Sequence, residues 1–575
     1  MESKDLSKKP DTHRIIKDIF INLFLVITGA FLFAFSNPNP IVKHGFSVTA
    51  WIMYVPLFFI IKRSSFKNCW LYTGLYGMLC VAAYAWWLYN YDPVCLYIAL
   101  PIAFLGTAIL GLLLKSVEKL FIKNAWLVQF LILCTFDYLR TLGFLGMHYG
   151  LAAYTQWNVP VIIQSAKIVG VYGLNAFVIF PSVLIFAFLS KMQDKKKYLH
   201  TIVSDNKFYD GASYVNYVSE NEKLMSNASL RNPVIGLCIW GFLFVVILIF
   251  GAISLKINEQ FDTVTVAAIQ HNDKPEENGI ENYSESLQQL ITLTDEALEI
   301  NPDIKIVVWP ETAFVPSVVY HAKSEGQSDR KKLVNFLMNY VNSRSPSFII
   351  GNQHIKTNPD GSGKEYFNAS ILFEAGKNGL ASDNQIYSKI KLVPFSEYFP
   401  YQKYFPHIYK SLLEYEQFFL DQGKELTVFN SNGLNIYTPI CFENTFPDLC
   451  RQAYKKGARS LFCLVSDSWS KSLICQNQHL AMAKFRAVEN RIPVVISSVS
   501  GQTAFLDQNG QVMVMALPFT QTYAIAQVPL VQPSQKATVY NQIGDIFGLA
   551  PLFLFIILLI IRSIIVIIRY IQKRK

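Results

Sequence analysis

The sequence contains no Cys-x-x-Cys pair, because its nine cysteines are scattered along 575 residues. It therefore gives no sign of a zinc knuckle or a redox-active dithiol. The histidines show no metal-ligand spacing, and the serine-hydrolase elbow, the P-loop and the dinucleotide-binding fingerprint are also missing. We accordingly expect no metal and no cofactor, and neither serine-hydrolase nor nucleotide chemistry is supported.

Charged residues make up only 16% of the chain and are scarce inside its long apolar runs. Apolar stretches of about 20 residues are typical of membrane helices. The run Val234–Phe250 has no polar face at any helical period, which argues against the buried helix of a soluble protein. We predict a polytopic α-helical membrane domain with about eight spans in all, at 17–36, 46–62, 69–89, 95–115, 124–141, 166–190, 233–255 and 547–568.

Lysine and arginine flank these runs on one side of the predicted membrane. By the positive-inside rule both termini are cytoplasmic, and seven crossings place 256–545 on the outer side. The flanks largely explain the net charge of +10, so this charge is weak evidence for nucleic-acid binding, and we expect none. The basic flanking residues include Lys8, Lys9, Lys62, Arg63, Lys191, Lys195, Arg569, Arg574 and Lys575.

These patterns divide the chain into three parts. Residues 1–255 are predicted to form a membrane domain with seven transmembrane helices, including a polar cytoplasmic loop at 191–232. Residues 256–545 have the composition of an ordinary α/β protein, and residues 546–575 supply the last span and a basic cytoplasmic tail.

Within 256–545, β-type runs alternate with helical patterns. Val264–Gln270 and Ser460–Val465 read as strands, whereas Tyr283–Leu298 and His479–Glu489 have helical spacing. This alternation predicts a layered α/β domain, in which functional residues collect where strands end.

A cysteine, a glutamate and a lysine each lie near the end of such a run. Cys441 follows Tyr437-Thr-Pro-Ile, Glu311 follows Val307-Val-Trp-Pro, and Lys389 follows Tyr387-Ser. A free thiol has a pKa near ~8.5, so a reactive cysteine needs a base and a nearby cation at neutral pH. The three residues together predict a thiol acyl-transfer site, although a cysteine at a strand end is by itself usually a small buried residue.

Three short motifs carry a resemblance to a known superfamily. In this order and at this spacing they resemble the nitrilase, or carbon–nitrogen hydrolase, superfamily, and with the spans around them the whole chain resembles the apolipoprotein N-acyltransferase family. The resemblance implies an extracytoplasmic nitrilase-like αββα sandwich on the periplasmic side of a bacterial inner membrane. The motifs are Trp309-Pro-Glu311, Lys389 with Leu392-Val-Pro-Phe395, and Ile440-Cys441-Phe-Glu443.

The resemblance also implies a mechanism. Cys441 would be the nucleophile, Glu311 the general base and Lys389 the cationic stabiliser. A phospholipid would donate an acyl chain to Cys441 as a thioester. The α-amine of a diacylglyceryl-cysteine at a lipoprotein N-terminus would then accept it, in the last step of lipoprotein maturation.

Supporting roles are expected for three neighbours of the motifs. Glu397 would orient Lys389, and the backbone N–H of Phe442 would help to stabilise an oxyanion. Glu443 would support the site, but a salt bridge to a nearby basic residue would look the same in sequence.

Several aromatic residues near the motifs could contact substrate. For Trp309, Phe395 and Tyr398, a role in lining the lipid entry and ordinary core packing are equally compatible with the sequence. The bilayer is the expected environment, and a monomer is the default expectation because nothing in the sequence shows an oligomeric state.

Two other functions compete with acyl transfer. One is a membrane-tethered nitrilase-type amidase, in which water rather than an amine accepts the acyl group. The other is a transporter or scaffold with a decayed enzyme domain, against which the retention of all three site residues argues. Pairing among Cys450, Cys463 and Cys475 is left open.

Overall fold

The computed structural model describes residues 12–121, 124–143, 146–204, 230–257, 260–273, 279–358, 360, 363–377, 380–414 and 419–574. Most of the predicted loop at 191–232, and the basic residues Lys8, Lys9 and Lys575, lie outside this description. The chain divides into two compact units. The first comprises Met1–Leu139, Asn175–Val246 and Phe547–Lys575, and the second comprises Arg140–Leu174 and Ile247–Ile546.

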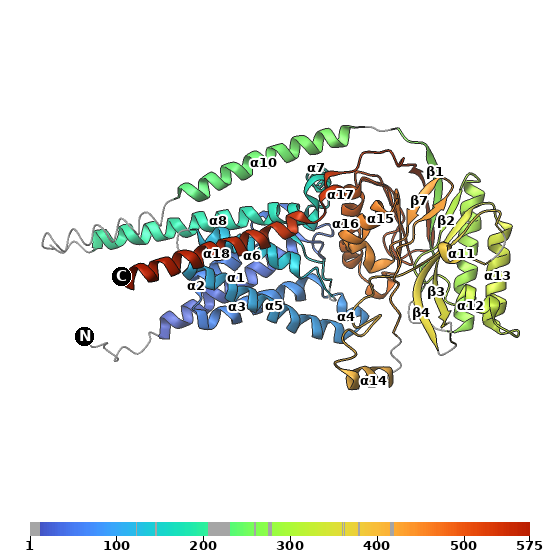
Figure 1. The fold of residues 1–575 in the computed structure, drawn as a ribbon, viewed down its shortest axis with the longest axis horizontal. Coiled ribbons are helices and arrows are strands. Elements are labelled where there is room, and N and C mark those ends of the chain that lie inside the picture. Colours follow the sequence, from blue (N-terminus) through green and yellow to red (C-terminus); the bar gives the residue numbers. More distant parts are fainter. Residues whose placement is uncertain are drawn as a thin grey trace. The chain divides into compact units, whose positions relative to one another are not determined.

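The first unit is helical (Figure 1). Three of its helices, α8, α10 and α18, continue into the sequence of the second unit. Its helices are α1 (Thr12–Ser36), α2 (Val55–Arg63), α3 (Phe66–Tyr84), α4 (Leu88–Tyr91), α5 (Pro93–Leu120), α6 (Ala125–Leu139), α8 (Ala166–Ser204), α10 (Arg231–Lys256) and α18 (Ile546–Arg574), with a short 3-10 helix η1 at Ser47–Trp51.

Five helices within the described ranges are long and apolar enough to cross a membrane, namely α1, α5, α8, α10 and α18. The other three predicted spans differ from a regular long helix. The stretch 46–62 is divided between η1 and α2, with Pro56 in the first turn of α2. Helix α3 begins with the polar residues Lys67 and Asn68, and α6 is only 15 residues long. An apolar run therefore did not guarantee one straight helix.

Helices α1, α3 and α5 run side by side in Figure 1, and α3 packs against both others. Glycine permits the close approach of α3 and α5. A Cβ on Gly77 of α3 would overlap Thr107 of α5, and a Cβ on Gly111 of α5 would overlap Thr73 of α3. Small residues at a helix interface let backbones come close where no hydrophobic effect drives association.

The second unit contains two six-stranded sheets. The first has the order β12-β1-β2-β3-β4-β5 and the second has the order β11-β10-β9-β8-β7-β6. Their strands are β1 (Thr263–Gln270), β2 (Ile306–Val308), β3 (Ser347–Thr357), β4 (Lys364–Phe373), β5 (Ile386–Ser388), β6 (Phe429–Ser431), β7 (Leu434–Tyr437), β8 (Ser460–Val465), β9 (Val494–Ser498), β10 (Ala504–Leu506), β11 (Val512–Met515) and β12 (Thr522–Pro529).

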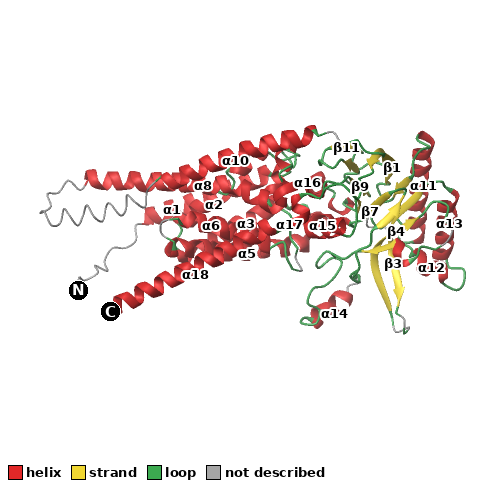
Figure 2. Cartoon of the chain, turned by 45° about the horizontal axis from the view of Figure 1, so that its top comes forward, coloured by secondary structure: helices red, strands yellow, loops and turns green. Residues whose placement is uncertain are grey.

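The two sheets stack between layers of helices, which gives the αββα sandwich (Figure 2). Ser497 on β9 bridges the sheets, because its hydroxyl donates to the carbonyls of Ile269 and Val308 at 3.0 and 3.1 Å. The remaining helices of this unit are α7 (Pro160–Ile163), α11 (Ile280–Ile300), α12 (Val318–Lys323), α13 (Asp329–Ser343), α14 (Pro406–Glu414), α15 (Pro447–Lys455), α16 (Leu473–Asn490) and α17 (Val539–Ile543), with 3-10 helices at Ala152–Gln156 (η2), Asp383–Gln385 (η3), Cys441–Thr445 (η4) and Ser468–Ser470 (η5).

Parallel pairing fixes the direction of the strands that lead to the site. Strand β2 lies between β1 and β3 and is parallel to both, and β8 lies in the same way between β7 and β9. Residues that follow the carboxyl ends of such strands gather at one edge. The segments after β2 and β7 carry Glu311 and Cys441.

Residues 140–174 pack within the second unit through buried polar contacts. Gln164 Nε2 donates to the Asn509 carbonyl at 3.0 Å, and Lys167 Nζ donates to Asn509 Oδ1 at 2.8 Å. Glu489 of α16 accepts a hydrogen bond from the Val171 N–H at 2.8 Å. This segment, predicted as part of the membrane domain, is thus grouped with the sandwich by its contacts.

Candidate active site

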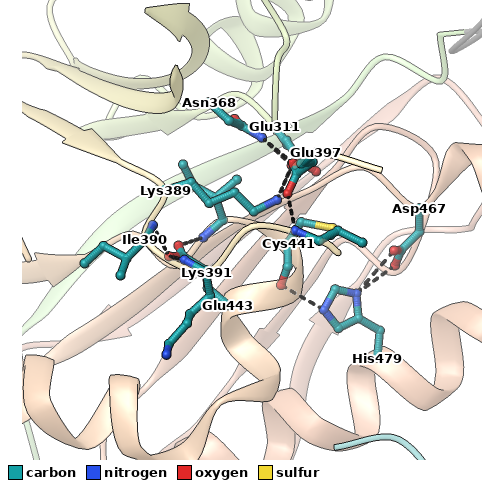
Figure 3. Close-up of polar contacts among 12 residues, drawn as sticks. Glu311, Asn368, Lys389, Ile390, Lys391, Glu397, Cys441, Glu443, Asp467 and His479 are labelled. Carbon is teal, nitrogen blue, oxygen red and sulfur yellow. Dashed lines mark hydrogen bonds and ion pairs between the residues drawn. The ribbon is translucent and has the colours of Figure 1, made fainter. Parts of the chain in front are cut away.

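Lys389 is buried between two carboxylates. It follows β5, and its Nζ lies 2.7 Å from Glu397 Oε1 and 3.2 Å from Glu311 Oε1 (Figure 3). Burial alone would lower the pKa of Lys389, but Glu397 and Glu311 outweigh burial and hold that pKa well above its ordinary value. Lys389 is therefore a fixed ammonium at the centre of the group.

Glu311 is held from two sides in the turn after β2. Asn368 Nδ2 donates to its Oε1 at 2.8 Å. Gly351 of β3 runs so close to the backbone of this turn that a Cβ there would overlap Pro310 and Thr312. Burial raises the pKa of Glu311, and Lys389 opposes this rise. Glu311 is thereby a carboxylate with raised proton affinity beside a permanent cation, which is what a general base requires.

Asn368 on β4 joins the group although its sequence context did not single it out. The side-chain amide donates to both Glu311 and Glu397, at 2.8 and 3.3 Å, and the backbone carbonyl of Asn368 accepts from the N–H of Lys389 at 2.8 Å. Little in the sequence signalled this role, because β4 also contains other polar residues, such as Ser370. In the structure Asn368 is buried, and buried amides need partners.

Glu397 is the second partner of Lys389, as expected. Its Oε1 accepts from Lys389, and its Oε2 accepts from the N–H of Val393 at 2.7 Å. The carboxylate is thus tied to the same loop that carries the lysine.

Cys441 is the first residue of η4 and has the left-handed backbone angle φ +49°. Such a conformation is unusual for a residue other than glycine and marks a constrained turn. The side chain is partly exposed, and in Figure 3 its sulfur lies beside Glu311, Lys389 and Glu397. Burial and Glu311 raise the pKa of Cys441 well above its ordinary value, against the opposing effect of Lys389. The resting form is therefore the thiol.

Glu443 is fully buried and ties two loops together. Its Oε1 accepts from the Tyr387 hydroxyl and from the N–H groups of Ile390 and Lys391, at 2.7, 2.7 and 3.0 Å. Its Oε2 accepts from the N–H of Ile440 at 2.8 Å. Glu443 therefore links the lysine loop to the residue before Cys441, which favours a supporting role over a surface salt bridge.

The other expected residues lie in different environments. Trp309 has no exposed surface, and its Nε1 donates to Thr294 at 3.0 Å within the core of the first sheet, which favours packing. Phe395 is 39% exposed with φ +66°, and its N–H donates to the Tyr398 carbonyl at 2.8 Å. Phe442 packs edge to face on Phe446 with ring centroids 5.0 Å apart.

A buried pair lies on the other side of Cys441, and the sequence had assigned neither of its residues a role in the site. His479 on α16 lies between Asp467 and the Cys441 carbonyl oxygen (Figure 3). Among the described residues, no three His, Cys, Asp or Glu side chains are grouped to hold a metal ion. Cys450, Cys463 and Cys475 are buried free thiols.

The sequence matches two described families. Residues 265–535 match the family described as carbon-nitrogen hydrolase, and residues 28–184 match the apolipoprotein N-acyltransferase N-terminal domain. The first match spans both sheets and the segments that carry Glu311, Lys389 and Cys441.

Curated relatives match over almost the whole chain. Apolipoprotein N-acyltransferase 1 of Treponema denticola is 34% identical over 92% of this chain and 94% of its own length. The protein of the same name from Treponema pallidum is 35% identical over 92% of this chain and 94% of its own length. Among solved structures, Saccharomyces cerevisiae Nit3, a member of branch 10 of the nitrilase superfamily, is 20% identical over 47% of this chain and 90% of its own chain, with a TM-score of 0.34.

The relatives cover both units, and the family matches cover both the helical region and the sandwich. The matches to the carbon-nitrogen hydrolase family and to the apolipoprotein N-acyltransferase N-terminal domain occur here in one chain. This chain is a member of the apolipoprotein N-acyltransferase family.

Proposed function

We propose that this chain transfers a fatty acyl group from a phospholipid to the α-amine of the diacylglyceryl-cysteine at a lipoprotein N-terminus. The observation that carries the proposal is the contact of buried Lys389 with Glu311 and Glu397 next to Cys441. Family membership supplies the class of donor and acceptor.

The first half-reaction begins with the resting thiol. Glu311 takes the proton from Cys441 Sγ as the sulfur attacks the ester carbonyl of the phospholipid. The Lys389 ammonium and the N–H of Phe442 stabilise the oxyanion of the tetrahedral intermediate. The carbon–oxygen bond then breaks, Glu311 returns its proton to the leaving hydroxyl of the lysophospholipid, and a thioester remains on Cys441.

The second half-reaction uses the same groups in reverse. The α-amine of the acceptor attacks the thioester, and Glu311 takes a proton from the nitrogen. The carbon–sulfur bond breaks, an amide forms, and Cys441 regains its proton from Glu311. Two substrates that react in turn at one site predict ping-pong kinetics.

The same proposal sets the location of the protein. Both substrates are anchored in lipid, so the sandwich would act at the periplasmic face of the inner membrane, with both termini in the cytoplasm. The basic flanks of the predicted spans support this orientation.

Mass spectrometry tests the first half-reaction. Purified protein is incubated with phospholipid vesicles, with Cys441→Ser as the matched control. We expect an acyl-sized mass increase on the wild-type Cys441 peptide that hydroxylamine removes. If folded protein gives no adduct with any of several phospholipids, the acyltransferase proposal fails and hydrolysis of a small amide becomes the better hypothesis.

A further inference from the structure

The peptide unit between Cys441 and Phe442 is held from one side by a buried histidine. His479 Nε2 lies 3.1 Å from the Cys441 carbonyl oxygen, and His479 Nδ1 lies 3.2 and 3.1 Å from the two oxygens of Asp467. Both residues are almost fully buried, at 3% exposure for His479 and 4% for Asp467. Neither residue has a place in the acyl-transfer steps described above.

The partners determine where the hydrogens of the ring lie. A carbonyl oxygen only accepts hydrogen bonds, so Nε2 must donate to Cys441. An ionised carboxylate also only accepts, so Nδ1 must donate to Asp467. Burial lowers the pKa of His479, but Asp467 outweighs this effect and the pKa lies above its ordinary value. The ring is therefore an imidazolium with both N–H groups engaged.

A trans peptide couples this contact to the reaction centre. In a planar trans peptide the C=O and the next N–H point in opposite directions, and the chain has no cis peptide bond among the described residues. In Figure 3 the Cys441 carbonyl points toward His479, whereas the sulfur lies on the side of Glu311 and Lys389. The N–H of Phe442, at the opposite end of this peptide, is therefore directed to the sulfur side.

We propose that His479, oriented by Asp467, is a positioning residue that aims the Phe442 N–H at the developing oxyanion by holding the Cys441 carbonyl at the opposite end of the same peptide. The N–H lies in the first turn of η4, where helical N–H groups lack partners within the helix. A cation on the carbonyl oxygen also polarises the amide and makes its N–H a stronger donor. This inference rests on the proposed function, since it concerns the oxyanion of that reaction.

The test compares two reactions of the same sulfur. Acylation by a phospholipid or by p-nitrophenyl octanoate forms a sulfur–carbon bond at a carbonyl, passes through an oxyanion and expels a lysophospholipid or p-nitrophenolate. Alkylation by iodoacetamide forms a sulfur–carbon bond at a saturated carbon, expels iodide and has no oxyanion. Both reactions require loss of the Cys441 proton, but only acylation forms an oxyanion. Only the rate of acylation therefore depends on the Phe442 N–H.

We expect His479→Ala to slow acylation by about 10²-fold, the usual effect of losing one oxyanion-hole donor, while the alkylation rate is unchanged. His479→Gln keeps an N–H donor at the end of the side chain and should acylate faster than His479→Ala. His354→Gln, at another buried histidine on β3, is the matched control. Cys441→Ala gives the background from other cysteines.

Two results would overturn the proposal: wild-type acylation rates in His479→Ala, or a parallel fall of acylation and alkylation, which would indicate a role in thiol reactivity or folding. The use of two acyl donors allows failure of the positioning role to be distinguished from failure of the proposed function. If wild type reacts with the nitrophenyl ester but with no phospholipid, the proposed donor is wrong, and the comparison of His479 variants still decides the positioning role.

Discussion

At the scale of single residues, the candidate site is built from carboxylates that differ in their contacts. Glu311 and Glu397 contact the Lys389 ammonium, whereas Glu443 contacts only backbone N–H groups and a tyrosine hydroxyl in the hydrogen bonds described. The first two set the charge of the site, and the third sets the position of the loops that form it.

Glu443→Gln should therefore act mainly by destabilising the loops of the site, and only through them on the reaction. The amide can accept on one atom, but its NH₂ would face an N–H that Glu443 now satisfies, and an unsatisfied buried group costs about 1–3 kcal/mol. We expect a lower midpoint of thermal unfolding in detergent together with slower acylation of Cys441. An unchanged midpoint with full activity would show that the four hydrogen bonds do not organise the site.

Asn368→Ala tests the residue that sequence reasoning missed. Hydrogen bonds to charged groups contribute about 1.5–3 kcal/mol, so loss of the amide that serves both carboxylates should slow acylation by about ten- to a hundredfold. The measurement is the rate of thioester formation followed by mass spectrometry. Ser370→Ala, two residues along the same strand, is the matched control, and equal rates in both variants would contradict the role of Asn368.

Glu311, Lys389 and Cys441 could be singled out from sequence because reactive side chains stand near the ends of apolar runs. Asn368 could not, and no role in the site could be assigned to Asp467 or His479, because the importance of these residues depends on contacts across the fold. Asn368 meets Glu311 only because β4 and the turn after β2 meet in space. His479 is separated from Cys441 by 38 positions and meets it through the packing of α16.

At the scale of elements, the glycines between α3 and α5 give a sharp prediction. Gly77→Leu places a side chain where Thr107 already lies, so it should separate the helices and lower the unfolding midpoint of purified protein. Gly241→Leu on α10 is the control, because a Cβ there meets nothing within 4 Å. Equal midpoints for the two variants would show that α3 and α5 do not pack closely.

Glu489 on α16 should make the free energy of unfolding depend on pH. Burial raises the pKa of Glu489 to about 7, against the effect of Arg486 and together with that of Asp545. The folded chain then binds more protons than the unfolded chain between the ordinary value of 4.5 and about 7, so this residue makes the unfolding free energy fall as pH rises through that window.

Glu489→Gln removes this titration and should flatten the dependence of the unfolding midpoint on pH between about 4.5 and 7. The amide oxygen can still accept from the N–H of Val171. Glu365→Gln, at a half-buried position of β4, is the matched control. A slope in Glu489→Gln equal to that of wild type would assign the pH dependence to other groups.

The periodicity of apolar residues predicted long elements well and short ones poorly. Strands β1 and β8 and helices α11 and α16 fall where the sequence placed them. The three-residue strand β6 was missed because so short a run has no readable period. Strand β12 was also missed, since its partner β1 and not its own composition defines it. The stretch 46–62 was predicted as one span because hydropathy does not register a break between η1 and α2.

At the scale of the whole molecule, the proposed orientation depends on the number of crossings. Four long apolar helices precede the sandwich within the described residues. An outer location for the sandwich with a cytoplasmic N-terminus requires an odd number. Either one or all three of the stretch 46–62, α3 and α6 must therefore cross as well, and the proposed orientation has all three crossing.

Cysteine labelling tests this orientation. The nine native cysteines are first replaced by alanine. Single cysteines are then introduced at Asp303, in the exposed turn before β2, and at Gln572, near the end of α18, and spheroplasts are treated with a membrane-impermeant maleimide. We expect Asp303→Cys to react in intact spheroplasts and Gln572→Cys to react only after permeabilisation. The reverse pattern would invert the proposed topology, and labelling of both in intact spheroplasts would contradict a cytoplasmic C-terminal tail.

The pairing of β1 with β12 has a consequence for biosynthesis. All eight residues of β1 pair with β12, so the strand that opens the sandwich is completed by a strand made about 250 residues later. A nascent chain that has not yet reached Thr522 presents β1 as an unpaired edge, which invites aggregation. We infer that the sandwich closes late in translation and that a ribosome stalled before this point leaves β1 without its full set of strand partners.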